Sequence, residues 1–307
     1  MKITNIHSVP ATLEALAARE YYSKGESQYS VTELLSPPRI RRLREEHDSE
    51  IVIDVSDMLW QLIGSALHVV MERGSIPGSL SEERLFVKVD GIILSGQIDL
   101  QEETTEGVVI TDYKFTSEWA YRSEKPDWEQ QLNVYRWLVE TTKPKNVVAL
   151  RVAALIRDFS RHNIGREGYP LAPIQMIDIP MWDTAKTEAF IRKRLEAHKN
   201  SKVDHAFGDA LTECTTEERW ESPTTYATKK KGRKTAIRVF STIEEATELA
   251  GKEKDGYVET RLGEPKRCTG NYCGVRDFCS QWTDRVAVEA ERERTRREEG
   301  AAEPDLS

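Results

Sequence analysis

The chain has 307 residues, of which 38% are hydrophobic and 31% are charged, and its formal net charge at pH 7 is −8. That length can bury a full hydrophobic core, and the composition is typical of a folded protein rather than a disordered one. No apolar run reaches membrane-spanning length and no secretory leader follows Met1, so we expect neither membrane insertion nor secretion. The negative net charge excludes a uniformly basic surface, but local basic patches can still bind nucleic acid.

Residues 1–55 predict a helical entry segment that packs on the core that follows. Ser30 or Thr32 can cap a short helix, and Pro37 and Pro38 would end it. A basic run comes next. Its arginines either face nucleic acid or form an exposed turn, and the sequence leaves both open: Arg39, Arg41, Arg42 and Arg44.

Residues 57–73 have the most regular helix pattern in the chain. Ser56 is a candidate N-cap, and Gly74 is a candidate stop. Five apolar residues form one stripe: Leu59, Ile63, Ala66, Leu67 and Val70. Gly64 and His68 are four residues apart and share a different face. A lone histidine on a helix is usually structural or exposed, but an imidazole can also complete a divalent-cation site made mainly of carboxylates.

Three strands are expected next: residues 83–91, 92–100 and 107–115. A polar segment that ends in glycine joins the last two, so we expect an antiparallel hairpin that brings Asp99 near Asp112. Glu82 and Glu83 lie at the start of the first strand. They could assist a site there, but glutamates in such positions are mostly solvated, and we expect both to be so.

Side chains alternate across a strand, so Asp112 and Lys114 share one face of the hairpin and Tyr113 points to the other. An Asp-x-Lys string taken alone is usually a solvated ion pair. This one lies in a β-branched and aromatic run, where unpaired charge would be costly. Two adjacent carboxylates repel unless a positive charge lies between them, and hard divalent cations prefer such oxygen ligands. The pattern therefore predicts a Mg²⁺ or Mn²⁺ site at Asp99 and Asp112.

A helix is expected over residues 127–140, with Asp127 in the cap position and Pro144 beyond its end. Gln131 and Tyr135 lie four residues apart and project together. Such a pair is common at the edge of a helix, although an amide beside a phenol can also orient a DNA strand or a water molecule.

Further strands over residues 146–159 and 174–182, and a helix over residues 183–200 opened by Asp183, complete the core. With the earlier elements they predict an α/β fold with a central mixed sheet flanked by helices.

Four motifs occur in a fixed order: G-x-x-x-H at residues 64–68, G-x-x-D at 96–99, D-x-K at 112–114 and Q-x-x-x-Y at 131–135. In this order the sequence resembles the PD-(D/E)XK nuclease superfamily in its RecB-like branch, which includes AddB and CRISPR-associated and phage exonucleases. The resemblance is tight over residues 55–140. It implies a restriction-endonuclease-like fold and a metal-dependent deoxyribonuclease, specifically an exonuclease, in the cytoplasm of a bacterium or of a phage-infected host.

The resemblance also implies a role for each motif residue. The Mg²⁺ or Mn²⁺ ligands would be His68, Asp99, Asp112 and the main-chain carbonyl of Tyr113. The catalytic set would be Asp99, Asp112, Lys114, Gln131 and Tyr135. DNA, as single strands or duplex ends, is the expected partner, together with a recombination or replication protein. The alternative is a non-catalytic DNA-binding or scaffold protein that keeps the fold and a structural metal site.

All four cysteines follow residue 210: Cys214, Cys268, Cys273 and Cys279. Their clustering predicts ligation, and disulfides are disfavoured in a reducing compartment. Four thiolates suit either a [4Fe–4S] cluster or a structural Zn²⁺. The resemblance favours iron–sulfur, since several RecB-like nucleases hold a cluster through three C-terminal cysteines and one distant cysteine. Here the distant cysteine follows the nuclease motifs instead of preceding them, and the first gap in the trio is wider.

The cysteines define the predicted domain organisation: an entry segment at residues 1–55, a nuclease core at 56–205, a small cysteine-closed subdomain at 206–282 and a charged, partly disordered tail at 283–307. The subdomain contains an insert of two short strands, a basic glycine turn and a helix capped by Ser241 or Thr242. The turn could contact phosphates or be a solvated tip, and its basic residues are Lys229, Lys230, Lys231, Arg233 and Lys234.

Overall fold

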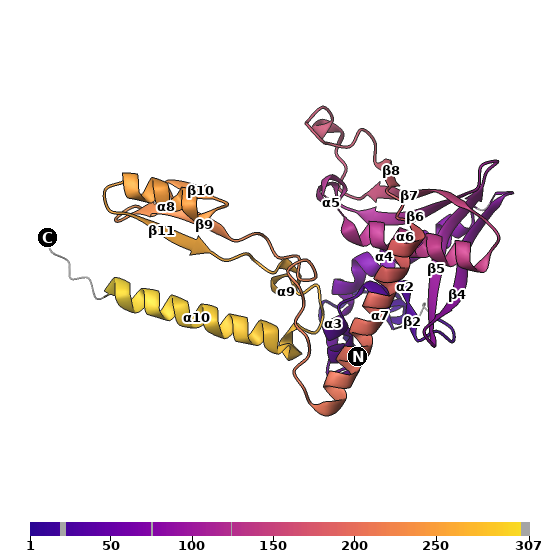
Figure 1. Cartoon of the computed structure of the whole chain (residues 1–307), viewed down its shortest axis with the longest axis horizontal. Helices are drawn as coiled ribbons and strands as arrows, with labels where there is room; N and C mark the ends of the chain where they lie inside the picture. The colour runs from indigo at the N-terminus through magenta and orange to yellow at the C-terminus, as the bar shows by residue number, and fades with distance from the viewer. Residues whose placement is uncertain (19–22, 75, 124, 302–307) are drawn as a thin grey trace. The chain divides into compact units, whose positions relative to one another are not determined.

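A computed structural model describes residues 1–18, 23–74, 76–123 and 125–301 (Figure 1). The chain divides into two compact units. The first unit comprises Met1–Ser36 and Ser49–Asp209, and the second comprises Pro37–Asp48 and Ala210–Ser307. The segment that was expected to be disordered after Gly300 lies mostly outside the described residues. No helix among those residues is both long and apolar enough to span a membrane.

A six-stranded mixed sheet forms the centre of the first unit, as predicted. Its strands are β2 (Tyr29–Ser30), β4 (Ser79–Val89), β5 (Ile92–Glu103), β6 (Val108–Thr116), β7 (Val147–Ile156) and β8 (Ile174–Ile179). The order is β2-β5-β6-β7-β8, and β4 pairs with β5. The β4–β5, β5–β6 and β7–β8 pairs are antiparallel, whereas β2–β5 and β6–β7 are parallel. The antiparallel hairpin expected for β5 and β6 is therefore confirmed.

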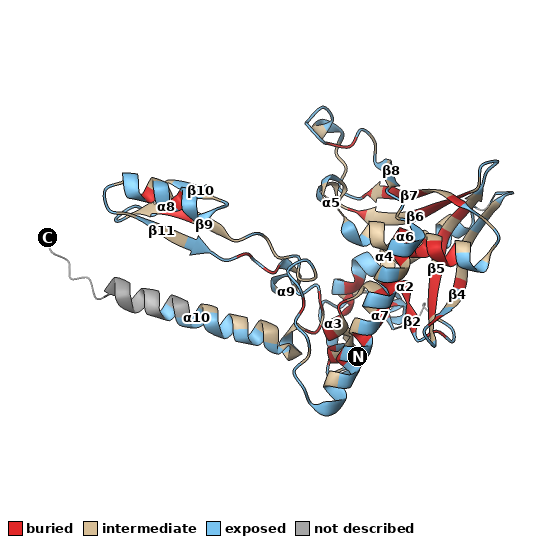
Figure 2. Ribbon diagram, in the orientation of Figure 1, coloured by how far each residue is buried: buried red, intermediate tan, exposed pale blue. Residues whose placement is uncertain are grey.

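Three helices share one hydrophobic core with this sheet: α2 (Val31–Leu35), α6 (Pro126–Thr142) and α7 (Thr184–Phe207). The largest fully buried side chains include Leu34 on α2, Leu94 on β5 and Leu138 on α6. Figure 2 shows the buried residues concentrated on β5 and α6. Asp183 caps α7 as predicted, since its carboxylate accepts a hydrogen bond from the Lys186 backbone N–H at 2.7 Å. In α6, by contrast, the cap position belongs to Lys125, and Asp127 lies in the first turn.

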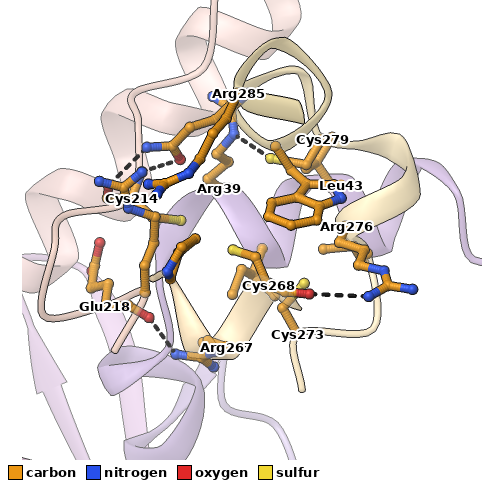
Figure 3. A pocket seen from close by; sticks show the side chains of 16 residues that line it. Arg39, Leu43, Cys214, Glu218, Arg267, Cys268, Cys273, Arg276, Cys279 and Arg285 are labelled. Carbon is orange, nitrogen blue, oxygen red and sulfur yellow. Dashed lines mark hydrogen bonds between the residues drawn. The ribbon is translucent and has the colours of Figure 1, made fainter. Parts of the chain in front are cut away.

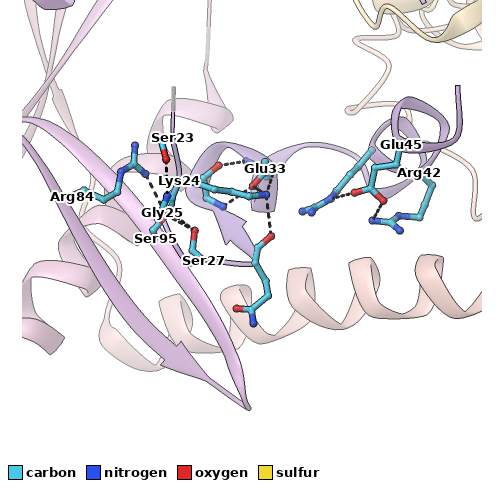
Figure 4. A network of polar contacts seen from close by, with 12 residues as sticks. Ser23, Lys24, Gly25, Ser27, Glu33, Arg42, Glu45, Arg84 and Ser95 are labelled. Atoms are coloured by element: carbon cyan, nitrogen blue, oxygen red, sulfur yellow. Dashed lines mark hydrogen bonds and ion pairs between the residues drawn. The ribbon is translucent and has the colours of Figure 1, made fainter. Parts of the chain in front are cut away.

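The loop before β2 is attached to the sheet by polar contacts (Figure 4). Lys24 forms an ion pair with Glu33 at 2.8 Å, and the hydroxyls of Ser27 and Ser95 are hydrogen-bonded at 2.7 Å. Ser30 caps α2 with a reciprocal capping box to Glu33, which decides between the two predicted caps.

The remaining elements of the first unit are short, except for the helix that carries His68. They are β1 (Lys2–Thr4), α1 (Ala11–Ala17), β3 (Val52–Asp54), the 3₁₀ helices η1 (Val55–Met58) and η2 (Arg161–Asn163), α4 (Leu59–Glu72) and α5 (Glu118–Arg122). Ser56 does not cap α4 as predicted, because its hydroxyl donates to Asp54, which caps η1. The predicted apolar stripe is not buried either. No residue of α4 is buried, and Val70 is 57% exposed.

The second unit contains α3 (Pro38–Glu46), β9 (Thr225–Lys230), β10 (Arg238–Phe240), α8 (Ile243–Lys252), β11 (Gly256–Arg261), α9 (Lys266–Thr269), the 3₁₀ helix η3 (Arg276–Phe278) and α10 (Ser280–Ala301). The two predicted strands of the insert are present as β9 and β10, with Thr242 at the cap of α8. A third strand, β11, was not predicted, and it pairs with β9 to complete a small sheet in the order β10-β9-β11.

Candidate active site

A gap along one edge of β5 creates the site. On this edge β6 pairs with residues 100–103 and β2 pairs with Leu94 and Ser95, so residues 96–99 face neither strand. The carboxylate of Asp99 fills part of the gap, because its Oδ2 accepts a hydrogen bond from the backbone N–H of Tyr113 at 2.8 Å. The side chain thus takes the place of a strand partner, and β5 and β6 are free to separate there.

Three acidic residues meet in a row at this gap. The β4–β5 register pairs Ser81 with Leu100 and Glu83 with Ile98, which leaves Glu82 opposite Asp99. The β5–β6 register ends with Leu100 opposite Thr111, and its next position would be Asp99 opposite Asp112. Carboxylates in adjacent cross-strand positions repel one another. The row therefore favours a bound cation.

His68 reaches the same place from α4. Its Nδ1 lies 3.0 Å from Oε1 of Glu82 and 3.6 Å from Oδ1 of Asp99. These three ligand atoms all lie within 4.8 Å of one another. Imidazole with carboxylates is a donor set that suits Mn²⁺ and accepts Mg²⁺. The residues therefore fit a divalent cation, although Asp112 lies outside this closest group of three.

The protonation of the site reflects its burial. Burial, followed by the negative charge of Asp112, raises the pKa of Asp99 to about 7 against the opposing effects of His68, the Tyr113 N–H and Lys114. The hydrogen bond to Glu82 raises the pKa of His68, and the charges of Asp99, Glu82 and Asp112 add to this against the effect of burial. A metal-free site thus retains protons that a cation would displace.

A second chain of contacts begins at Asp112, whose side chain is only 2% exposed. Its Oδ2 lies 2.7 Å from the ammonium of Lys114, which donates to Oε1 of Gln131 at 2.9 Å. The amide nitrogen of Gln131 donates to the hydroxyl of Tyr135 at 2.8 Å. A solvated surface pair, the alternative for Asp112 and Lys114, is therefore excluded by burial.

Side chains on the two faces of β6 lie beside different helices. Lys114 extends to Gln131 on α6, whereas Tyr113 and Phe115 line a pocket with Gly64 and His68 of α4, of about 240 Å³ including space open to solvent. This is the alternation predicted for the strand. Because the site lies at the gap in the sheet, residues from helices on both faces can contribute to it.

Only one of the two motif glycines is required by the packing. A Cβ on Gly96 would lie 2.5 Å from Cδ1 of Leu138 and 2.9 Å from Cε1 of Tyr135, so glycine lets α6 approach β5. A Cβ on Gly64 would meet no atom within 4 Å. Packing therefore does not require glycine at position 64.

Glu82 is the residue that the sequence analysis missed. It was expected to be solvated, but its side chain is 16% exposed and faces His68 and Asp99. A signal was present in the sequence. Asp90 and Gly91 form a two-residue turn of the kind that fixes hairpin register, and counting back from this turn places Glu82 opposite Asp99.

The four cysteines line a cavity of about 450 Å³ in the second unit, a volume that includes space open to solvent (Figure 3). All four are free thiols, and burial raises the pKa of Cys214 to about 12. Among the described residues, no three sulfur atoms lie within 4.8 Å of one another. The four sulfurs of a tetrahedral zinc site, each about 2.3 Å from the ion, would lie about 3.8 Å apart. No three of the four cysteine sulfurs among the described residues are that close together.

Several basic residues of the second unit already have hydrogen-bond or ion-pair partners within the chain. Arg39 cannot face DNA, because it is 6% exposed and donates to Sγ of Cys279 at 3.2 Å and to Oγ of Ser280 at 2.7 Å. In the insert, Lys229 pairs with Glu259 at 3.0 Å, and Lys230 lies 3.9 Å from Glu253. Two of the five basic residues proposed for phosphate contact therefore already face carboxylates.

Comparison with known proteins agrees with the geometry. No curated protein matches the sequence. The crystal structure of SSO0001 is similar at 16% sequence identity and a TM-score of 0.41, over 61% of this chain and 82% of that one. The model of the PD-(D/E)XK nuclease superfamily matches residues 11–280, a span that includes all four motifs. The chain belongs to the PD-(D/E)XK nuclease superfamily.

Proposed function

We propose that the chain is a Mg²⁺- or Mn²⁺-dependent deoxyribonuclease of the RecB-like branch that acts as an exonuclease. The superfamily implies a nuclease with DNA as its substrate and usually a divalent cation. The observation that carries the proposal is that His68 approaches Asp99 at the gap in the sheet, while Asp112, paired with Lys114, occupies the next cross-strand position beside Asp99. Side chains from α4, β5 and β6, far apart in the sequence, meet there.

In this proposal His68, Asp99, Asp112 and the main-chain carbonyl of Tyr113 hold the cation. A bound divalent cation supplies positive charge to the attacked phosphate and lowers the pKa of water. Asp99 has a second task, because it also holds the Tyr113 N–H and so fixes the position of the following carbonyl. Loss of its carboxylate would disturb both the charge and the geometry of the site.

Lys114 is the residue placed to act on the water and the phosphate. Asp112 and Gln131 hold its ammonium from two sides, at 2.7 Å and 2.9 Å. An ammonium fixed in this way can donate a hydrogen bond that orients the attacking water, and its positive charge can offset charge on the phosphate. Gln131 is itself held by Tyr135, so α6 contributes a positioning pair.

The experiment compares cleavage of end-labelled linear DNA and closed circular DNA with Mg²⁺, Mn²⁺ or EDTA. We expect cation-dependent loss of linear substrate only. The variants Asp112→Asn and Lys114→Ala should each lose at least about a hundredfold of this activity, the scale of an acid–base or electrostatic contribution.

Asp178→Asn is the matched control, since Asp178 is 86% exposed on β8 and pairs with Arg151. It should retain full activity. Full activity of Lys114→Ala would overturn the site assignment, and cleavage of closed circles would overturn the exonuclease assignment. Binding without cleavage under every condition would favour the non-catalytic alternative.

We further propose that the cysteine cavity holds a [4Fe–4S] cluster rather than Zn²⁺. The proposal is supported by the four cysteines lining one cavity although Cys214 lies far before the other three in the sequence, and by the resemblance to RecB-like nucleases with a C-terminal cysteine trio. Arg39 supports ligation at this site, because its guanidinium donates to Cys279 and would stabilise a thiolate ligand. Arg219, Arg267 and Arg276 also line the cavity and would offset the negative charge of four thiolates.

A further inference from the structure

Glu82 interrupts an otherwise regular strand pairing. The β4–β5 register is the same before and after it, yet Glu82 and Asp99 are not themselves paired. Its backbone has a φ of 54°, in the left-handed region that non-glycine residues rarely adopt. Such conformations cost free energy and persist where the surrounding structure holds them, often at functional sites.

Both carboxylate oxygens of Glu82 have defined partners. Oε1 lies 3.0 Å from Nδ1 of His68, and Oε2 accepts a hydrogen bond from the amide of Gln97 at 2.7 Å. Gln97 is in turn contacted by Arg84, which also donates to Ser95 at 3.3 Å (Figure 4). One oxygen is therefore fixed by the sheet, and the other is presented to the site.

We propose that Glu82 is a protein ligand of the divalent cation, beside His68 and Asp99. This rests on the proposed function, and it adds a residue that none of the four motifs contains. Neighbouring ligand atoms of an octahedral cation at about 2.1 Å lie about 3.0 Å apart. The separation of 3.0 Å from Nδ1 of His68 to Glu82 equals this spacing, and the separation of 3.6 Å to Asp99 is longer by about the small shift that a bound cation would draw in.

The direction of approach distinguishes a ligand from a residue that only orients His68. A carboxylate that orients a metal-bound histidine usually bonds the ring nitrogen remote from the metal. Here Glu82 and Asp99 converge on the same nitrogen, Nδ1. Glu82 therefore lies on the cation side of the imidazole. A cation would also relieve the repulsion between two carboxylates in directly opposed strand positions.

The test measures Mn²⁺ binding to the full chain without DNA, by calorimetry and by the EPR signal of free Mn²⁺. Glu82→Gln keeps the shape of the side chain and its contact with Gln97 but removes the charge. We expect its Kd for Mn²⁺ to rise at least about tenfold, the scale on which even the outer partners of metal ligands act. Circular dichroism should show an unchanged fold.

Glu83→Gln is the matched control. Glu83 is the next residue in β4, but its carboxylate accepts from Gln101 at 2.6 Å and pairs with Lys143, away from His68. Its substitution should leave the Kd unchanged. An unchanged Kd for Glu82→Gln, with binding abolished in Asp99→Asn, would overturn the role of Glu82 and leave the proposed function standing. Absence of Mn²⁺ binding by the wild-type chain would instead reject the metal site itself, and with it the role of Glu82.

Discussion

At the scale of single residues, the carboxylate of Asp54 accepts hydrogen bonds from three residues near the start of the first unit. The backbone N–H of Ile6 donates to it at 2.8 Å, the hydroxyl of Thr4 at 3.1 Å, and Ser56 donates through both its N–H and its hydroxyl. Asp54 also caps η1, which leads directly into α4 and His68. One side chain therefore connects the N-terminal strand to the helix that reaches the site.

The first prediction concerns the pH dependence that Asp54 confers. The hydrogen bond from the Ile6 N–H, followed by those from Ser56, holds the pKa of Asp54 well below its ordinary value of 3.8. A carboxyl whose pKa is lower in the folded state than in the unfolded state stabilises the fold at pH values above its unfolded-state pKa. This stabilisation is lost as the pH falls through the folded-state pKa. Asp54→Asn should therefore unfold at a lower urea concentration than wild type at pH 6. The difference between the two urea midpoints should shrink below about pH 4.

The measurement is urea unfolding followed by circular dichroism at several pH values between 3 and 7. Asp178→Asn, on an exposed strand edge, serves as the control and should change the midpoint little at any pH. A difference between Asp54→Asn and wild type that stays constant down to pH 3 would show that the hydrogen bonds do not favour the ionised carboxyl.

At the scale of elements, the packing of α6 on β5 determines where the polar groups of α6 lie. Tyr135 and Leu138 rest directly over Gly96, and Gln131 lies one turn before Tyr135 on the same helix. The contact from Gln131 to Lys114 therefore depends on how closely the helix approaches the strand. A side chain at position 96 would displace the helix from the sheet.

The second prediction compares alanine at the two motif glycines. Gly96→Ala should destabilise the chain by about 1–3 kcal/mol, the range for overpacking a core, and should lower nuclease activity by moving Gln131. Gly64→Ala introduces a Cβ into open space in a helix and should be stabilising by about 0.5–1 kcal/mol. Thermal unfolding of the two variants separates these effects. Equal loss of stability in both would mean that position 64 of helix α4 is not in open space.

At the scale of the whole molecule, the two units differ in what stabilises them. Among the described residues, the largest fully buried side chains all belong to the first unit. The buried apolar residues of the second unit are few and mostly small: Ile40, Leu43, Ala227, Ala246, Ala250 and Val275, together with Cys214 and Cys273. Small units with limited cores commonly depend on a metal or another cross-link.

The third prediction is that the cysteine site stabilises the second unit selectively. Anaerobically purified protein should be brown and contain about four iron atoms per chain. A variant with all four cysteines replaced by serine should be colourless, and limited proteolysis should cut it rapidly within residues 210–282 while a fragment containing residues 49–209 persists. Stoichiometric zinc in a colourless wild-type protein would support the zinc alternative, and equal protease sensitivity of both proteins would show that the cysteines hold no stabilising metal.

The sequence predicted those features that depend on short-range patterns. The β5–β6 hairpin followed from its polar turn, and strand and helix periods placed Asp112 beside Lys114 and Gln131 beside Tyr135. The contact between the two pairs depends on how α6 packs on the sheet, which these periods do not determine. The apolar pattern of α4 was misleading, because period alone cannot show whether a partner covers the stripe. Strand β11 was missed because it depends on pairing with β9, about 30 residues earlier in the chain.

The Asp90–Gly91 turn has a consequence for how this chain can vary. Val89 pairs with Ile92 across it, so the turn alone sets which residue of β4 stands opposite Asp99, although it is far from the gap. A change in the loop that slides the strands past each other by one position would bring Ser81 or Glu83 to that place. Loop length usually varies freely at a protein surface, but in this hairpin a change that shifts the register would move Glu82 out of the acidic row without altering any residue in it.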